Sequence, residues 1–321
     1  MSEQVSMIDA LLGPRIGSNE KLSKIEAMID WSRLGKLVER PDHRSDQGVM
    51  GRPAYPALSM LKAVYLQSLY DLSDPGLEEA LLDRLSFRRF CGFGLDQKTP
   101  DETTICRFRA EAARSKLLER CFEEITRQLQ AKGLMLKKGT LMDATIVAAA
   151  HNPPPRQAGM GVDHAKEPGA GWINKNGKSY FGYKLHIGLD LGSGLIRKAC
   201  FTTAHLQDIE AAQELISGDE AAVYADRGYE SQALRDSLRQ RGCKDRIMHR
   251  RHRYMKVLPR LKTLRNTAIS KRRAPVEAPF SALKRIYGKA RARCHSLLVN
   301  TADYFAFVTI YNLRCACIIT A

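Results

Sequence analysis

The chain has 321 residues, of which 44% are hydrophobic and 27% charged, a balance typical of a globular protein with room for two domains. Its net charge of +16 is concentrated in one segment: residues 239–293 hold 19 lysines and arginines and two acids, which leaves 32 of the 51 basic and 33 of the 35 acidic residues elsewhere. A surplus this local predicts a polyanionic partner, although a solvated basic face is the alternative.

Cysteine usage and hydropathy indicate the compartment. The eight cysteines form no Cys-x-x-Cys pair, and no histidines follow them at zinc-finger spacing, so buried, reduced thiols are expected. The polar start Met1–Gln4 predicts no secretory leader, and no apolar run is expected to reach the length that spans a membrane. These features predict a cytoplasmic protein with no membrane association.

The first part of the chain, residues 1–135, is predicted to be a helical domain. Residues 57–70 place apolar side chains on one stripe at helical spacing. The turn at 73–76 predicts the start of a second helix, and residues 103–109 begin a third, capped by Asp101 or a neighbouring threonine. Arginines on these helices are compatible with DNA binding or with plain packing, and the pattern alone leaves both open.

Residues 136–321 are predicted to form a mixed sheet flanked by helices, an α/β fold. Between the first two strands, near 151–178, a polar stretch rich in proline and glycine predicts a flexible or functional loop. In chain order, the expected elements are strands at 140–147, 180–189 and 195–204, a helix at 208–216, a strand ending at Asp226, a helix at 232–241, a short strand at 246–249 and a helix that carries Glu277.

Three carboxylates stand where a metal ion could use them. Asp143 interrupts an apolar run, Asp226 ends another, and Glu277 starts a helix within the basic segment. Mg²⁺ prefers oxygen ligands, and two such ions about 4 Å apart can activate the attacking oxygen and stabilise the leaving one in phosphoryl transfer. Singly, the residues have plainer explanations, namely a turn cap, a bend and an ion pair with Arg273. Together with the basic segment they favour cutting and joining of nucleic acid.

Other basic residues are weaker candidates for DNA contact or catalysis. The run 249–254 contains Arg250, Arg251 and Arg253, for which we expect contacts to the DNA backbone, with a solvated surface as the alternative. Lys184 and His186 lie in a predicted core strand, where a histidine is more often a hydrogen-bonded core residue than a catalytic one.

Motifs along most of the chain, from about 45 to 315, resemble the DDE transposases of bacterial insertion sequences, specifically the insertion sequence five group. In the N-terminal part they are Gly51-Arg52-Pro53, Met60-Leu61-Lys62, Leu72-Ser73-Asp74, Phe87-Arg88-Arg89-Phe90 and Pro100-Asp101-Glu102-Thr103-Thr104-Ile105. In the core they are Asp143-Ala144-Thr145, Gly182-Tyr183-Lys184-Leu185-His186, Ala225-Asp226-Arg227-Gly228-Tyr229 and the spaced set Arg273, Glu277 and Lys284. Each motif is weak alone, but their common order is specific.

This resemblance implies a ribonuclease-H-like core in which Asp143, Asp226 and Glu277 are the catalytic metal ligands for two Mg²⁺ ions, or Mn²⁺ in their place. It also implies that Arg273 and Lys284 hold DNA phosphates. The family usually has a tyrosine three residues before the arginine, where this chain has Ser270, so any DNA contact of that tyrosine is in doubt here.

The resemblance implies a transposase that binds the terminal inverted repeats of its element through the helical domain and acts on double-stranded DNA at the element ends and the target. Mg²⁺-dependent phosphodiester hydrolysis would be followed by strand transfer, in a homodimer or higher assembly associated with the nucleoid. The alternatives are an inactive DNA-binding repressor derived from a transposase, a metal-dependent nuclease without strand transfer, and a basic structural protein of nucleic-acid assemblies.

Overall fold

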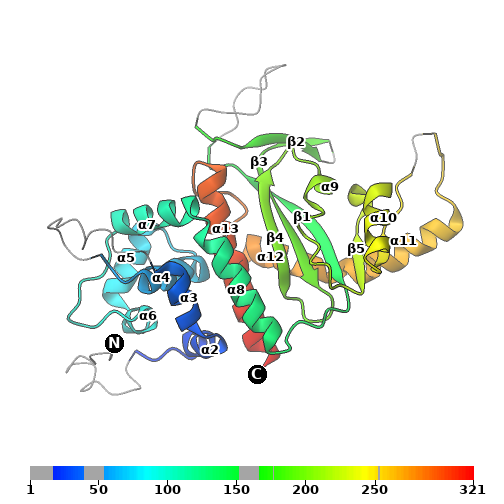
Figure 1. Cartoon of the computed structure of the whole chain (residues 1–321). Helices are drawn as coiled ribbons and strands as arrows, with labels where there is room; N and C mark the ends of the chain where they lie inside the picture. Colours follow the sequence, from blue (N-terminus) through cyan, green and yellow to red (C-terminus); the bar gives the residue numbers. More distant parts are fainter. Residues whose placement is uncertain (1–16, 40–53, 152–165, 176, 252–253) are drawn as a thin grey trace. The chain divides into compact units, whose positions relative to one another are not determined.

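The structure is a computed structural model that describes residues 17–39, 54–151, 166–175, 177–251 and 254–321 (Figure 1). Its internal contacts divide the chain into two compact units. One unit comprises residues 1–129 and 305–321, and the other comprises residues 130–304. The sequence analysis placed all of 136–321 in one domain, whereas by contacts the end of the chain groups with the N-terminal helices.

The first unit is helical, and polar side chains mark where several of its helices begin. Asn19, Asp30, Ser73 and Asp101 each accept a hydrogen bond from a backbone N–H of the helix that follows, which satisfies one of the donors left open at a helix start. The helices are α2 (Glu20–Met28), α3 (Trp31–Val38), α4 (Ala57–Tyr70), α5 (Asp74–Asp83), α6 (Leu85–Cys91), α7 (Glu102–Arg114) and α8 (Leu117–Ala131).

Helix α4 is the central element of this unit, since every residue from Ser59 to Leu69 is buried. An ion pair between two other helices is also largely buried: Arg109 of α7 donates through Nη1 and Nη2 to the two carboxylate oxygens of Asp74 at the start of α5, both at 2.6 Å. Only 14% of the Arg109 side chain and 20% of the Asp74 side chain are exposed. The pair therefore fixes α5 against α7.

The last helix, α13 (Leu297–Ile319), runs from the second unit into the first, where Phe305 packs edge-on against Phe122 of α8. With 23 residues and a mean hydropathy of 1.3, α13 is long and apolar enough to cross a membrane. The expectation that no segment reaches that length is therefore wrong. However, 67% of its apolar window is buried inside the protein, as in the core helix of a globular domain.

The second unit is built on a six-stranded mixed sheet in the order β2-β3-β1-β5-β6, with β4 also paired to β3. β1 runs antiparallel to β3 and parallel to β5, and β5 runs parallel to β6. The strands are β1 (Thr140–Ala148), β2 (Gly171–Lys175), β3 (Lys178–Asp190), β4 (Ile196–Thr203), β5 (Ala222–Ala225) and β6 (Lys244–Ile247). The predicted mixed α/β architecture is confirmed.

Helices cover both faces of the β1–β5–β6 part of this sheet. Met142, Val223 and Ala225 belong to an apolar core that includes Leu234 and Leu238 of α10 (Gln232–Gln240). On strands, neighbouring side chains point to opposite faces, so the residues between these core positions face the other side. There α11 (Arg260–Arg273) packs on β5, and the short helix η2 (Ala274–Val276) packs on β1.

Several elements differ from the sequence predictions, among them α13, which follows the last predicted helix. β2 lies within the stretch 151–178 that was expected to be a loop. Its short run pairs with the start of β3, a long-range contact that the local sequence does not indicate. Helix α9 (Asp208–Ala211) covers only the start of the predicted helix at 208–216. The basic helix α11 was not predicted at all. It has one buried side chain, Ile269, and thus lacks the apolar stripe that identifies most helices.

We predict that Asp74→Ala destabilises the helical unit by about 2 kcal/mol, because it leaves the mostly buried Arg109 guanidinium without its bidentate partner. Urea unfolding followed by circular dichroism measures the change. The exposed Asp83 at the end of the same helix serves as control, and Asp83→Ala is expected to cost less than about 0.5 kcal/mol. Equal effects of the two substitutions would contradict a structural role for the ion pair.

Candidate active site

Asp143 and Asp226 occupy corresponding positions on two neighbouring parallel strands. The register pairs Leu141 of β1 with Tyr224 of β5. Continued by two residues along both strands, it brings Asp143 beside Asp226, the residue that directly follows β5. The charge of Asp226 raises the pKa of the Asp143 carboxyl, so the two carboxylates are close enough to interact.

Hydrogen bonds orient both carboxylates. Asp226 caps the short helix η1 (Arg227–Tyr229), and its Oδ1 accepts from the Gly228 N–H at 2.9 Å. Asp143 Oδ1 accepts from the Ala144 N–H, also at 2.9 Å. The second oxygen of Asp143 forms an ion pair with Arg273 Nη2 at 2.9 Å. Arg273, the last residue of α11, is thereby bound to Asp143 of β1.

The charge balance at Asp143 favours a cation. Burial raises the pKa of the Asp143 carboxyl, the Arg273 guanidinium lowers it, and the neighbouring Asp226 charge raises it again; the net pKa lies above the ordinary value. Arg273 therefore compensates only part of the cost of burial and like-charge repulsion. Additional positive charge at this position would lower that cost further.

Glu277 lies next to the same strand, although not in the immediate cluster. It begins α12 (Glu277–Arg285) directly after η2, which packs on β1, and it is exposed. The prolines at 275 and 279 flank it, and the helix starts at this residue as the sequence indicated. The ligand atoms of Asp143, Asp226 and Glu277 do not all lie within 4.8 Å of one another. Among the described residues, a different set of side chains has that spacing.

A fourth acid, Asp208, lies near Asp226. A Cβ added to Gly228 would lie 3.0 Å from Asp226 Oδ1 and 3.6 Å from Asp208 Oδ2, so both carboxylates border this glycine. The other oxygen, Asp208 Oδ1, pairs with Lys184 Nζ at 2.9 Å. The sequence analysis gave Asp208 no role beyond starting a helix, since nothing in the local sequence shows which strand end its side chain faces.

Tyr229 is a second group that the sequence analysis did not single out as a site residue. Its side chain is buried, and its hydroxyl has no hydrogen-bond partner among the described residues. Burial raises the pKa of the phenol, and the charges of Asp208, Asp143 and Asp226 raise it further. The group therefore remains a proton donor beside the acidic cluster.

His186 is held within the core and is not free to act at the acidic pair. It is completely buried, and its Nε2 lies 2.9 Å from the Thr202 hydroxyl. Burial lowers the pKa of the imidazole to about 4, so it is neutral at neutral pH. Its Nδ1 has no hydrogen-bond partner among the described residues and lies 4.0 Å from Asp208 Oδ1, so only one of the two ring nitrogens of this core histidine is hydrogen-bonded.

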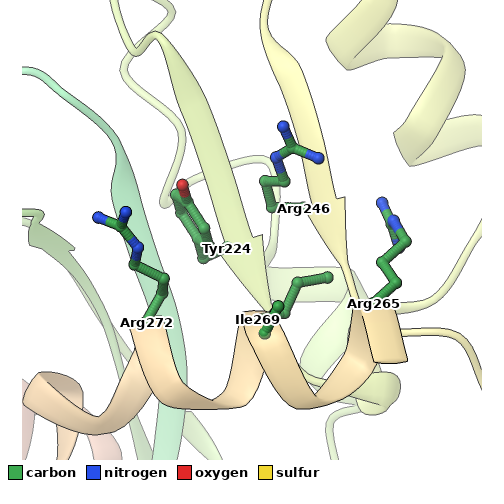
Figure 2. Close-up of a pocket in the computed structure, with 6 residues that line it drawn as sticks. Tyr224, Arg246, Arg265, Ile269 and Arg272 are labelled. Carbon is green, nitrogen blue, oxygen red and sulfur yellow. The ribbon is translucent and has the colours of Figure 1, made fainter. Parts of the chain in front are cut away.

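The basic segment forms a positively charged surface around α11. An open hollow between α11 and the sheet is lined by Tyr224 of β5, Arg246 of β6 and Arg265 and Arg272 of α11 (Figure 2). Among the described residues, no acidic side chain lines this hollow. Arg265 is anchored, since it donates to the carbonyls of Ile247 at 2.6 Å and of Asp245 at 2.9 Å.

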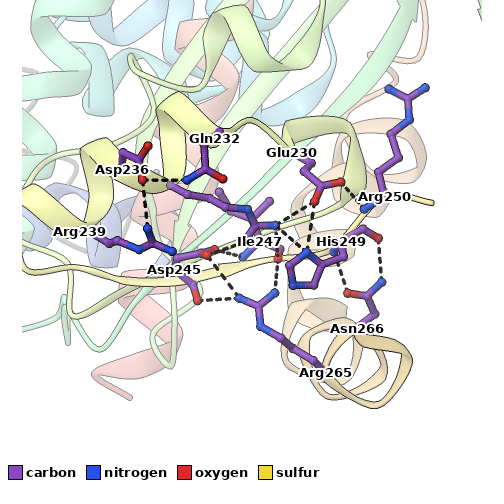
Figure 3. A network of polar contacts seen from close by, with 11 residues as sticks. Glu230, Gln232, Asp236, Arg239, Asp245, Ile247, His249, Arg250, Arg265 and Asn266 are labelled. Atoms are coloured by element: carbon purple, nitrogen blue, oxygen red, sulfur yellow. Dashed lines mark hydrogen bonds and ion pairs between the residues drawn. The ribbon is translucent and has the colours of Figure 1, made fainter. Parts of the chain in front are cut away.

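A polar network fastens α11 to β6 (Figure 3). Asn266 of α11 accepts from the His249 N–H at 2.8 Å and donates to the His249 carbonyl at 2.9 Å. Arg235 of α10 is buried and binds Asp245 and Glu230. Because α11 buries a single side chain of its own, these hydrogen bonds rather than an apolar core fix it on the sheet.

The predicted phosphate contacts differ in how available they are. Lys284 is exposed in the last turn of α12. Arg250 and Arg251 are exposed at the end of β6; the Arg250 N–H donates to Glu230, and Arg251 Nη1 donates to the Lys256 carbonyl at 3.0 Å. Arg273 is engaged by Asp143. Arg253 lies outside the described residues.

Two family models match this chain. Residues 11–111 match the family described as Transposase domain (DUF772), and residues 135–313 match the Transposase DDE domain, which covers more than half of the chain. The chain belongs to the DDE transposase family. Membership implies a DNA-binding, DNA-cleaving enzyme.

Among solved structures, a piggyBac transposase synaptic complex with hairpin DNA is similar to this transposase, with a TM-score of 0.45 and 10% sequence identity. The similarity covers 95% of this chain and 74% of that chain. At this score it carries no argument about details of the site.

The DDE transposase family generally uses divalent metal ions, and the acidic pair of this transposase suits one. The carboxylates of Asp143 and Asp226, whose charges act on each other, offer the hard oxygen donors that such an ion prefers. A cation bound here would offset the burial and the charge repulsion that raise the pKa of Asp143. The donor set thus fits a divalent metal ion.

We predict that the catalytic unit of this transposase loses stability as the pH falls from 6.5 towards 4, partly through His186. The unfolded chain protonates this histidine near pH 6.5 but the folded protein only near pH 4. Between these values the unfolded state binds more protons, so the loss from this residue reaches on the order of 3 kcal/mol.

The check is the free energy of unfolding against pH for wild type and His186→Gln, with the exposed His205→Gln as control. His186→Gln is expected to flatten the curve between pH 6.5 and 4, whereas His205→Gln leaves its slope unchanged. Identical slopes for all three proteins would show that His186 is not buried in its neutral form.

Proposed function

We propose that this transposase binds the terminal inverted repeats of its own insertion sequence, hydrolyses the phosphodiester at the element ends, and joins the freed 3′-hydroxyl to target DNA. The observation that carries the proposal is the interaction between Asp143 on β1 and Asp226 directly after the neighbouring strand β5, since the charge of Asp226 raises the pKa of the Asp143 carboxyl. Membership of the DDE transposase family and the order of the acidic motifs support it.

A ribonuclease-H-like core is part of this proposal. In the sheet, β1 lies between β3, to which it is antiparallel, and β5, to which it is parallel; β4 pairs with β3, and β6 pairs with β5. This arrangement supports such a core. So do the positions of the acids, on the first strand, after the strand beside it, and at the start of a late helix. Assignment to the insertion sequence five group rests on the motifs from Gly51-Arg52-Pro53 to Lys284.

Asp143, Asp226 and Glu277 are the proposed ligands of two Mg²⁺ ions. Bound there, the ions would activate the attacking oxygen and stabilise the leaving oxygen of an in-line displacement at phosphorus. When two ions lie about 4 Å apart, an oxygen bound to one ion can be up to about 8 Å from an oxygen bound to the other. The three acids therefore need not be as close together as the ligands of a single ion. The position of Glu277 next to η2 is compatible with the outer end of such a set.

The remaining residues of the site would bind and orient DNA. Arg273 neutralises Asp143 in the free protein and, once a cation replaces it there, its guanidinium becomes available to a phosphate beside the acids. Arg246 and Arg272 line the hollow next to this position and would bind the backbone of the same duplex. Lys284, Arg250 and Arg251 would extend the contact along α12 and the end of β6, with Arg253 from the adjoining segment.

We predict that Asp226→Asn and Glu277→Gln each lower cleavage of an end-bearing duplex by at least about 10³-fold while DNA binding persists. The assay measures Mg²⁺-dependent strand cleavage, and a mobility-shift titration measures binding. Asp236→Asn, which removes an exposed acid of α10 in the same unit, is the matched control and should cleave as wild type does. Cleavage retained in either ligand variant would refute its assignment.

A strand-transfer assay separates the proposed enzyme from its alternatives. With a pre-cleaved end and a supercoiled target, we expect joined product that requires Mg²⁺ and is lost in Asp226→Asn. A nuclease without transfer would cut the end but yield no joined product. A repressor would bind the ends without cutting them, and a structural protein would bind DNA with no dependence on Mg²⁺. Each of these three outcomes contradicts the proposal.

A further inference from the structure

A second candidate metal site lies beyond the C-terminal end of β1 and shares no residue with the acidic pair. His151 follows β1, Glu167 precedes β2, and His295 precedes α13. One ligand atom from each of these side chains lies within 4.8 Å of the other two, and no other group among the described His, Cys, Asp and Glu residues does so.

The spacing suits a tetrahedral ion. Glu167 Oε1 lies 3.0 Å from His151 Nδ1 and 3.7 Å from His295 Nδ1. With bonds of about 2.0 to 2.1 Å in a tetrahedral site, neighbouring ligand atoms lie about 3.3 Å apart, midway between these two distances. The two imidazole rings are close as well, with centroids 4.4 Å apart.

The buried carboxylate calls for a cation. None of the Glu167 side chain is exposed, and in the part of the chain that the structure describes its ion-pair partners within 4 Å are the two histidines, which are charged only when protonated. Hydrogen bonds from the His151 N–H at 2.7 Å and the Tyr183 hydroxyl at 3.0 Å stabilise this carboxylate, and a divalent ion would add the positive charge that these neutral donors lack. Two neutral imidazoles and one carboxylate are also a common ligand set of Zn²⁺.

The surrounding contacts hold the three ligands in place. The buried Tyr183 hydroxyl donates to Glu167 Oε2 at 3.0 Å, and the backbone N–H of His151 donates to Oε1 at 2.7 Å, which orients Oε1 towards the two imidazoles. The Leu297 N–H donates to the Pro168 carbonyl at 3.0 Å, which ties the Glu167 segment to the His295 segment.

Two further contacts fix the segment before α13. Asn300 binds both the N–H and the carbonyl of Cys294, at 3.2 and 2.7 Å. At the end of β1, Ala148 exchanges backbone hydrogen bonds with residues 290 and 292, which bring the His295 segment alongside His151. Ligands positioned in this way by their neighbours are a mark of built metal sites.

We infer that His151, Glu167 and His295 bind one divalent transition-metal ion of the Zn²⁺ class, with a fourth position open to water. Its nitrogen ligands set it apart from the oxygen ligands proposed for Mg²⁺. Because the three residues come from segments far apart in sequence, the ion would join the end of β1 to the connection between α12 and α13.

The test uses the full-length protein, ZnCl₂ as the probe and excess Mg²⁺ to occupy the acidic site. After gel filtration, wild type is expected to retain about one Zn²⁺ per chain, and Co²⁺ in its place should give the visible absorption of a tetrahedral site. His295 is the best residue to replace, since 61% of its side chain is exposed and its loss should leave the fold intact.

His295→Ala should lower Zn²⁺ affinity at least about tenfold and abolish the rise in Tm that Zn²⁺ gives wild type. His205→Ala, the matched control, and Asp226→Asn should bind as wild type does. The inference is overturned if wild type shows no saturable Zn²⁺ binding. It is also overturned if His295→Ala binds equally well, which would assign the metal to the cysteines, or if only Asp226→Asn loses it, which would assign the metal to the acidic site.

Discussion

The parallel pairing of β1 with β5 is the constraint on which the catalytic unit depends, because it forces two carboxylates together. Asp143 and Asp226 share a register position, and their repulsion together with burial raises the pKa of Asp143. Arg273 offsets part of this cost from the opposite side. A site that stays electrostatically unsatisfied without a metal is well suited to bind one.

The basic helix α11 explains how positive charge can be concentrated beside an acidic centre. The helix has almost no apolar face, so it could not be held by burial alone, and hydrogen bonds through Asn266 and Arg265 hold it instead. Of its other cations, Arg272 is exposed at the hollow near Tyr224, and Arg273 is paired with Asp143. Stability and function are separated along one helix: a few polar side chains fasten it to the sheet, and the others remain free to meet a polyanion.

Much of the architecture could be predicted because it depends on local pattern. The apolar runs of β1 and β5, each marked by one aspartate, and the proline-flanked start of α12 at Glu277 are visible in the sequence. By contrast, β2 is stabilised by its pairing with β3, and α11 by side-chain hydrogen bonds from distant residues, so neither leaves a periodic signal. For the same reason the sequence did not indicate a role for Asp208 or for the cluster of His151, Glu167 and His295. Only the tertiary structure brings these residues together.

The central claim is that Asp143, Asp226 and Glu277 share divalent ions at the edge of β1 and β5. Anomalous diffraction from crystals grown with Mn²⁺ and a cleaved DNA end tests it most directly. The account predicts two peaks about 4 Å apart, each about 2.0 to 2.3 Å from carboxylate oxygens, with all three residues among the ligands. Peaks elsewhere, or a complex in which Glu277 stays remote from every ion, would contradict it.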